Sequence, residues 1–413
     1  MQSEDLLLRL VAILLAALLG GWLLERLRQP PIMGYIVAGA VLGFQFKHTL
    51  PSRDFLEHSG EIGLVLMLFF IGTEVNISRL ARDWRIPLFG TLLQTAVSIV
   101  VCLLGGLLFD WKIGQSIFFA FMVSLSSTAV VLRILEDFGG TDSVIGRKTL
   151  GILLLQDLMV IPMLIVLGMM RGKSQLDLSL LLRQVLGAVI VIGVAAFLST
   201  RSKLSIPDWL RLHQNHEFRV LTGLVFCLGA ATLTGYLGLS PALGAFLSGM
   251  VMGRMEAQLK LHEMLEPFKV IFVAIFFLTI GLLVDVQFLV ENAGRIGFLV
   301  LMVFLLNTVL TTGILKLLGM PTVESLATAC LLSQIGEFAF LLASSARRYR
   351  LIDSDTHQTA VAVIALSLLF TPLWFAIARK VMRVSLGSSA TIALSITPER
   401  PAARNKLFDW RIR

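Results

Sequence analysis

The chain has 413 residues, of which 56% are hydrophobic and 15% are charged. A water-soluble domain this apolar would aggregate, so the composition argues against an ordinary soluble protein and indicates one that lies in a lipid bilayer. The formal net charge of +8 does not indicate a nucleic-acid partner, because Lys and Arg fall in short clusters between apolar runs and form no basic face.

Apolar runs of about 20 residues, the length that crosses a bilayer as a helix, follow one another along the chain. In the first predicted span, 5–24, the apolar run from Leu6 to Leu24 follows Glu4 and Asp5 and precedes no small-residue cleavage site, so we interpret it as a retained span and not a signal peptide. Including that run, we predict about 13 transmembrane helices, the others being 31–46, 60–76, 86–109, 113–135, 147–170, 180–200, 218–237, 240–253, 268–285, 296–318, 323–346 and 358–381.

Lys and Arg are concentrated in the connections that follow the odd-numbered spans. Cytoplasmic loops carry the excess of positive charge, so the N-terminus is expected outside and the C-terminus in the cytoplasm. The predicted location is the bacterial inner membrane, with a transmembrane domain of residues 1–383 and a polar, basic cytoplasmic tail of residues 384–413.

One set of glycine and proline spacings occurs twice, 210 residues apart. The matched pairs are Pro31/Pro241, Gly34/Gly244, Gly39/Gly249, Gly43/Gly253 and Pro162/Pro372. The copies lie seven spans apart, an odd number, so the second copy must cross the membrane in the opposite sense. The sequence therefore predicts two inverted six-helix repeats, at about 5–170 and 218–381, joined by a linker helix at about 180–200. This is the architecture of alternating-access transporters.

Asp157 is an acid in the middle of the sixth span, with no basic residue within eight positions. An ionisable group inside an apolar span is costly, which makes it a candidate functional residue. Protons and alkali cations compete for one carboxylate, so we expect Asp157 to bind each in turn. Pro162 lacks the N–H that would occupy the carbonyl of Leu158, which frees a second oxygen near the acid. The alternative is a protonated Asp that only bonds a neighbouring helix.

Spans five and twelve are expected to be interrupted. Ser126, Ser127 and Thr128 weaken the first helix in mid-span, and the 210-residue offset places Gly336 and Glu337 opposite the two serines. Unwound backbone at this depth is tolerated only where it lines a cavity or is buried in protein, and its half-helix ends can face an ion. The alternative is a packing seam of small polar residues.

Glu337 admits two interpretations. One is a second ion ligand. The other, which we favour, is compensation of the positive end of the half-helix that begins after Gly336.

No cofactor or enzymatic activity is predicted. Cys102, Cys227 and Cys330 lie far apart inside apolar runs, without the spacing of a metal site or a disulfide framework. An intramembrane protease would need a second acid in a Gly-x-Gly-Asp setting or a His-Glu-x-x-His motif, and neither occurs in the sequence.

Six motifs together resemble the Kef-type branch of the bacterial monovalent cation/proton antiporters. They cover about residues 5–381 and are the Pro-x-x-Gly-x4-Gly-x3-Gly of span two, the stretch from Glu61 to Phe69, Ser124 to Ala129, Gln156-Asp157 with Ile161-Pro162, Glu266 to Lys269, and Gly336 to Phe340. The resemblance implies a sodium/proton antiporter-like fold, in which a mobile core with crossed, unwound helices moves against a dimerisation domain, and therefore a homodimer.

The resemblance also implies the transported ions. The acid that matches Asp157 is the ion site of the family, and a Gln before it, here Gln156, is similar to the potassium efflux type. A single exchanged carboxylate beside a neutral Gln predicts electroneutral potassium/proton exchange.

The sequence departs from gated Kef relatives after the last span. Those relatives continue into a nucleotide-binding domain with a Gly-x-Gly-x-x-Gly turn, which is absent from this sequence. A separate or missing regulatory domain is therefore expected. The connection 254–268, which carries His262, Glu263 and Glu266, resembles the family's regulatory loop. The alternatives to potassium/proton exchange are a gated potassium channel, a sodium/proton antiporter, and a membrane sensor or scaffold that keeps the fold without transport.

Overall fold

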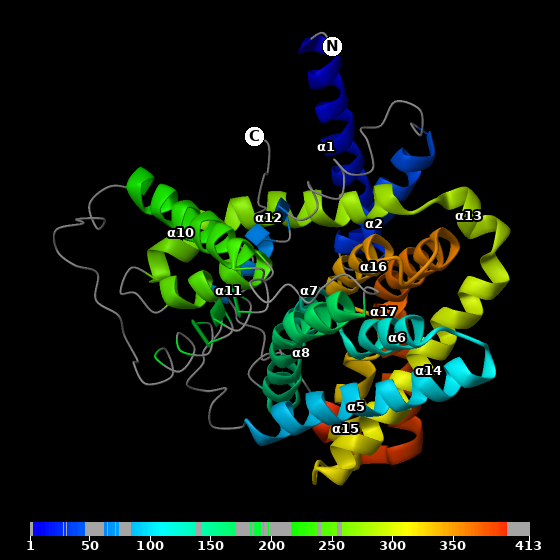
Figure 1. Ribbon diagram of the computed structural model, residues 1–413. Coiled ribbons are helices and arrows are strands. Elements are labelled where there is room, and N and C mark those ends of the chain that lie inside the picture. Colours follow the sequence, from blue (N-terminus) through cyan, green and yellow to red (C-terminus); the bar gives the residue numbers. More distant parts are fainter. Residues whose placement is uncertain are drawn as a thin grey trace, which may run out of the picture.

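In the computed structural model of the chain, most of the described residues lie in helices and none lies in a strand (Figure 1). These residues are 3–27, 29, 31–45, 62–63, 65–70, 72–73, 84–137, 143–170, scattered positions within 182–197, 216–237, 241–253 and 258–394. The all-α prediction is confirmed for this part of the chain, because apolar runs in lipid satisfy their backbone hydrogen bonds most simply as helices.

The first half of the chain contributes α1 (Ser3–Arg26), α2 (Pro31–Gln45), α5 (Arg85–Leu108), α6 (Ile113–Ser124), α7 (Thr128–Asp137) and α8 (Val144–Met169). The second half contributes α10 (His216–Tyr236), α11 (Pro241–Met252), α12 (Gln258–Leu283), α13 (Val286–Glu291), α14 (Ala293–Leu317), α15 (Thr322–Leu331), α16 (Phe338–Arg348) and α17 (Ser354–Leu394).

Within the described residues, five helical segments are long and apolar enough to cross a membrane: 85–108, 113–135, 144–169, 293–317 and 354–382. Shorter apolar helices include α2, α11 and α15. Parts of the predicted third span and most of the linker helix lie outside the described residues. The count of 13 spans therefore stays a prediction.

The helices recur with the 210-residue offset found in the sequence. The break between α6 and α7 matches the break between α15 and α16, and α8 and α17 begin at Val144 and Ser354. The matched helices α1 and α10 each pack against the following helix, α2 and α11. Among the described residues, the pattern therefore extends from single glycines to whole helices.

The repeated glycines bring helices of different repeats into close contact. A Cβ atom on Gly39 of α2 would overlap the backbone of α12 at Leu278, and a Cβ atom on Gly249 of α11 would overlap the backbone of Phe69. The same close contact is seen from the α12 side, where a Cβ atom on Gly281 would overlap the carbonyl oxygen of Ile36 on α2. Small residues allow this approach, which explains their recurrence in membrane helices.

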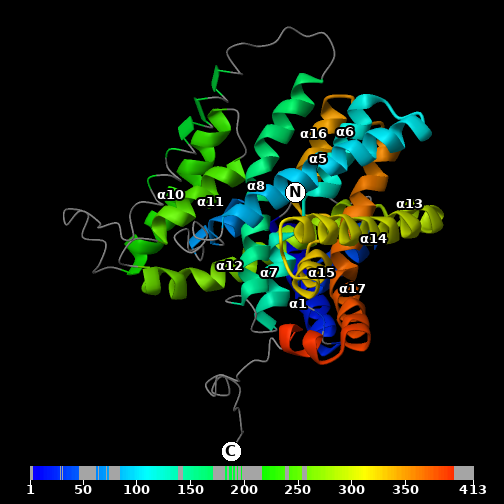
Figure 2. The ribbon, with the colours of Figure 1, turned by 90° about the horizontal axis from the view of Figure 1, so that it is seen from below.

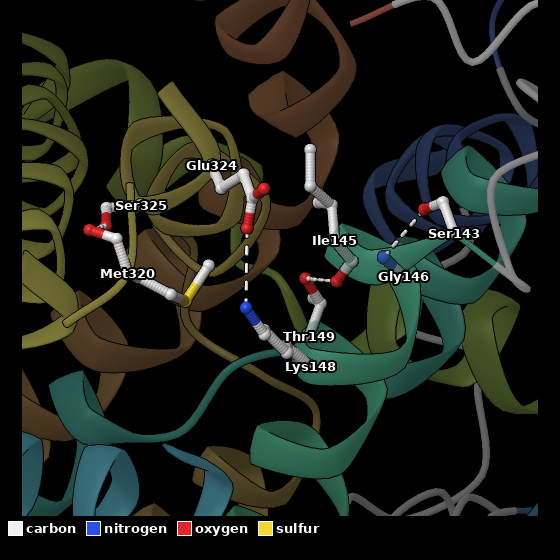
Figure 3. A network of polar contacts seen from close by, with 8 residues as sticks. All are labelled: Ser143, Ile145, Gly146, Lys148, Thr149, Met320, Glu324 and Ser325. Carbon is white, nitrogen blue, oxygen red and sulfur yellow. Dashed lines mark hydrogen bonds and ion pairs between the residues drawn. The ribbon is translucent and has the colours of Figure 1, made fainter. Parts of the chain in front are cut away.

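Most of the helices around the predicted site gather on one side of the molecule, and α8, which carries Asp157, packs against them. Figures 1 and 2 both show α5, α6 and α14–α17 there and α10 with α11 on the opposite side, with α8 between the two groups. The start of α8 is tied to the start of α15 by an ion pair of 3.3 Å between Lys148 and Glu324 (Figure 3).

Two helix boundaries and one additional helix differ from the sequence predictions. The helix α12 begins at Gln258, so the predicted loop 254–268 is helical from that residue onward. The short helix α13, which Asp285 caps through the N–H groups of Gln287 and Phe288, was not predicted. Helix α17 continues to Leu394, past the predicted start of the tail at 384. Hydropathy marks the apolar part of a helix, and these extensions lie beyond it.

Candidate ion-binding site

Two helices of the core are interrupted, at residues 125–127 and 332–337, and the interruptions cross. The Gly336 N–H donates to the carbonyl oxygen of Leu125 at 2.8 Å, and the Ser126 hydroxyl donates to the carbonyl oxygen of Leu332 at 2.8 Å. A Cβ atom on Gly336 would lie 2.6 Å from the carbonyl carbon of Ser126. The interruptions predicted for spans five and twelve are therefore present, and only a residue without a side chain fits at their crossing.

Asn307 on α14 holds the two interruptions together from one side. Its Nδ2 atom donates to the carbonyl oxygen of Val123 at 3.0 Å and to that of Ser333 at 3.2 Å. Val123 lies at the end of α6 and Ser333 follows α15, where backbone carbonyls lack intrahelical partners. A single buried amide thus satisfies carbonyls from both half-helices, which fixes their relative position.

Asp157 lies at the middle of α8, beside the first interruption. Its Oδ2 atom accepts a hydrogen bond of 2.9 Å from the hydroxyl of Thr128, the first residue of α7. The Asp157 side chain is partly exposed, whereas Gln156 and Ser127 on either side of the contact are buried. The acid is thus less tightly enclosed than these two neighbours.

Gln156 caps the unwound backbone. Its Oε1 atom accepts from the Ser126 N–H at 3.0 Å, and its Nε2 atom donates to Gln94 Oε1 on α5 at 3.0 Å. The equivalent interruption in the second repeat is capped by Ser367, whose hydroxyl accepts from the Ile335 N–H at 3.2 Å. Ser367 lies 210 positions after Asp157. In the first repeat the neighbouring Gln caps the backbone instead, which leaves the carboxylate of Asp157 available.

Glu337 lies directly before α16, as predicted from the sequence, and is 1% exposed. It makes no side-chain capping bond, and neither of its carboxylate oxygens has a hydrogen-bond partner among the described residues. It is close enough to Asp157 for the two carboxyl groups to interact electrostatically. Its position at the positive end of α16 fits dipole compensation, and its proximity to Asp157 fits a second ligand, so both interpretations remain.

The remaining residues predicted for the site are Ser127, Leu158 and Pro162, and their contacts differ. Ser127 contacts its own helix, since its hydroxyl accepts from the Val130 N–H at 3.2 Å. Leu158 packs against the hydrophobic core, and Pro162 is exposed on α8, which continues through it.

The predicted regulatory residues His262, Glu263 and Glu266 belong to the first part of α12 and not to a loop. Their side chains lie outside the described residues.

Three polar residues of the site were not predicted from the sequence, namely Gln94, Asn307 and Ser367. Each is a single uncharged polar residue in an apolar run, and each is 0–3% exposed. Buried amides and hydroxyls in membrane helices are expected to find partners, so a search for isolated Gln and Asn in the spans would have found the first two.

The donor set at Asp157 consists of oxygen atoms. It comprises the carboxylate and the Thr128 hydroxyl, and hard oxygen ligands suit alkali cations. Within the described residues, no group of three or more His, Cys, Asp and Glu is arranged to hold a metal ion. Interrupted helices that meet an acid at mid-span are the arrangement of ion-coupled secondary transporters.

The chain belongs to the sodium/hydrogen exchanger family, whose transmembrane domain profile matches residues 13–379. It is 36% identical over 371 residues to the iron transporter MagA of Paramagnetospirillum magneticum, a match that covers 90% of this chain and 85% of that protein. It is 32% identical to K(+) efflux antiporter 6 of Arabidopsis thaliana, covering 89% of this chain and 62% of the relative.

Two further similarities concern bacterial and archaeal proteins. The glutathione-regulated potassium-efflux protein KefC of Salmonella typhi is 29% identical, over 97% of this chain and 64% of that protein. The solved structure of the sodium proton antiporter MjNhaP1 from Methanocaldococcus jannaschii aligns with a TM-score of 0.66 at 15% identity, over 95% of this chain and 100% of that chain. The predicted antiporter-like fold is thereby confirmed. The chain spans less than two thirds of the length of two of these relatives, KefC and antiporter 6.

Proposed function

We propose that the chain is an electroneutral potassium/proton antiporter, in which Asp157 carries the potassium ion in one direction and the proton in the other. The observation that carries this proposal is the position of Asp157 in the middle of α8, bonded to Thr128 at the start of a half-helix. A carboxylate there crosses the membrane neutralised by one ligand and returns neutralised by the other, which is the minimum for obligatory exchange.

Gln156 supports the electroneutral part of the proposal. It stands next to Asp157 and is neutral, so the site has one fewer negative charge than a site with two adjacent acids would have. Its carbonyl oxygen has a second lone pair beyond the one that receives the Ser126 N–H, and that lone pair can face a bound ion. The loaded site is then neutral with either one proton or one potassium ion.

Potassium is favoured over iron as the cargo, although one relative is named an iron transporter. Several imidazole and carboxylate ligands together suit iron(II), whereas no group of three or more His, Cys, Asp and Glu that could hold a metal ion occurs within the described residues. The side-chain contact shown at Asp157 is with an oxygen atom, the Thr128 hydroxyl. The relatives named for potassium efflux come from both a plant and a bacterium. Iron(II) nevertheless belongs in the panel of tested cations.

The remaining features of the proposal concern the assembly. We place the protein in the bacterial inner membrane with the N-terminus outside and the C-terminus in the cytoplasm, as a homodimer that moves its core against a dimerisation domain. The core and the dimerisation domain are built from the two repeats, 5–170 and 218–381, with the linker helix 180–200 between them. Regulation is assigned to a separate cytoplasmic domain or subunit, and no enzymatic activity or resident cofactor is included.

The test is the release of a proton gradient by cations in proteoliposomes that hold the purified protein and a pH-sensitive dye. Potassium, rubidium, sodium, lithium and, without oxygen, iron(II) are added in turn. We expect potassium and rubidium to collapse the gradient at low concentration and sodium and lithium only at higher concentration. Collapse of the gradient by sodium alone or by iron(II) alone would show that this ion, and not potassium, is transported. A conductance far above carrier rates would indicate a channel, and no response would indicate a sensor or scaffold.

A further inference from the structure

Helix α5 carries a buried polar face that the proposed exchange does not account for. Thr91, Gln94, Thr95 and Ser98 follow one another at helical spacing and are each 1–6% exposed. Residues at this spacing lie on one side of a helix, and here that side faces protein, because several apolar residues of the same helix, such as Leu92, Val100 and Leu104, are exposed. Polar groups buried in a membrane protein are kept where they have partners or a function.

Only one member of this face reaches the ion site. Gln94 Oε1 accepts the hydrogen bond from Gln156 Nε2, whereas the Thr91 hydroxyl donates to the carbonyl oxygen of Ile152 at 3.4 Å. The hydroxyls of Thr95 and Ser98 have no hydrogen-bond partner among the described residues. The four residues are thus alike in burial and polarity but differ in connection to the site.

Two hydrogen bonds connect Ser126 to Gln94 through Gln156, and in each the donor is on the Ser126 side. The Ser126 N–H is a donor, so the group facing it must be the Gln156 oxygen, and the Gln156 Nε2 atom must point to α5. That nitrogen is buried and requires an acceptor, which Gln94 supplies. If Gln94 offered no acceptor, the Gln156 amide would gain by turning away, and the Ser126 N–H would lose its cap.

We propose that Gln94 is a positioning residue for cation binding, which acts through Gln156. It holds the Gln156 amide against the interrupted helix and thereby fixes Ser126 and the following Thr128 relative to Asp157. The inference rests on the proposed cation/proton exchange, because it concerns the apparent affinity and selectivity for the exchanged cation. Ligands that are held in place before binding discriminate between ions of different size better than ligands that adjust.

The second repeat shows that the fold itself does not require the amide pair. The positions that match Gln94 and Gln156 at the 210-residue offset are Phe304 and Leu366. Phe304 stacks on Trp374 with a ring-centroid distance of 5.1 Å. The second interruption is nevertheless formed and capped, with the Ser367 hydroxyl in place of the Gln. The amide pair therefore belongs to the half of the molecule that carries the acid, which fits a role in ion binding.

The first test compares Gln94→Met with the matched variant Ser98→Ala in proteoliposomes, with initial rates measured against potassium and sodium concentration. Met has the length of Gln but no strong acceptor, and Ser98 is equally buried on the same face. We expect Gln94→Met to raise the apparent KM for potassium about three- to tenfold, as for loss of one neutral hydrogen bond. The maximal rate should change by less than about twofold, and the preference for potassium over sodium should fall. Ser98→Ala should match the wild type.

The outcomes separate this inference from the proposed function. A wild type that exchanges no cation refutes the proposed function. Exchange with an unchanged KM in Gln94→Met, or an equal rise in KM in Ser98→Ala, overturns the role of Gln94.

A second measurement needs no transport. The apparent melting temperatures of Gln94→Met, Gln156→Met and the double variant form a cycle, and the double variant should melt near the temperature of Gln156→Met alone. Additive losses would contradict the link between the two amides.

Discussion

Replacing Asp157 with Asn abolishes cation-driven proton movement in the proposed mechanism and leaves the protein folded. The Asn side chain has nearly the same shape, and its oxygen can still accept the hydrogen bond from Thr128. It cannot release or bind a proton at neutral pH, and it offers a cation no negative charge. If the charged carboxylate contributes about 3 kcal/mol or more to binding of the exchanged ion, its loss lowers exchange at least about 100-fold.

The measurement for Asp157→Asn is dye dequenching in proteoliposomes, together with size-exclusion chromatography and the apparent melting temperature of the purified variant. A folded variant with the wild-type elution volume and no exchange is the expected result. Asp157→Glu is the matched control, since it keeps the charge and should retain measurable exchange with altered cation preference. Exchange by the Asn variant at more than about one tenth of the wild-type rate would remove Asp157 from the centre of the mechanism.

Replacing Gly336 with Ala should disrupt the crossing of the interrupted helices. The added Cβ atom would meet the backbone of Ser126 and Ser127, which cannot move aside as a flexible side chain can, and the hydrogen bond from the Gly336 N–H to Leu125 would be strained. Forcing a methyl group into a packed site costs about 1–3 kcal/mol or more. We expect a clear fall in apparent melting temperature and a loss of exchange of at least about tenfold.

Gly313→Ala is the matched control for Gly336→Ala. Gly313 lies in α14, and a Cβ atom there would meet nothing within 4 Å. Ala favours helix more than Gly, so this variant should be as stable as the wild type or slightly more stable. If Gly336→Ala melted and exchanged like Gly313→Ala, the two interruptions would not be in close contact at Gly336.

The features that could be predicted from the sequence are those that leave a local or periodic trace. The 210-residue offset pairs the interruption at Ser126 with the one at Gly336, because tight crossings in membranes demand small residues and each repeat carries its own copy of them. Asp157 could be identified as a candidate site residue because an acid in an apolar run is rare. Both signals arise from the cost of placing the wrong residue in lipid or at a crossing.

The contacts that complete the site could not be predicted in the same way. Gln94 contacts Gln156 across 62 positions, and Asn307 contacts Val123 across 184, so nothing in the local pattern connects them. The predicted boundary of α12 was wrong because its first turns mix polar and charged residues with apolar ones, and hydropathy does not distinguish such turns from a loop. Long-range pairing depends on how the helices pack, and a single sequence does not contain that information.

The central claim is that Asp157 alone carries the exchanged ligands, one potassium ion or one proton at a time. The most direct measurement follows both ions in the same proteoliposomes, with labelled rubidium for the cation and a pH electrode for the proton, at two clamped membrane potentials. The account predicts one proton per rubidium ion at both potentials, because a cycle that moves no net charge gains nothing from the potential of about 2.3 kcal/mol per charge per 100 mV. Two protons per rubidium ion, or a ratio or rate that follows the potential, would contradict it and would indicate that Glu337 also exchanges its proton.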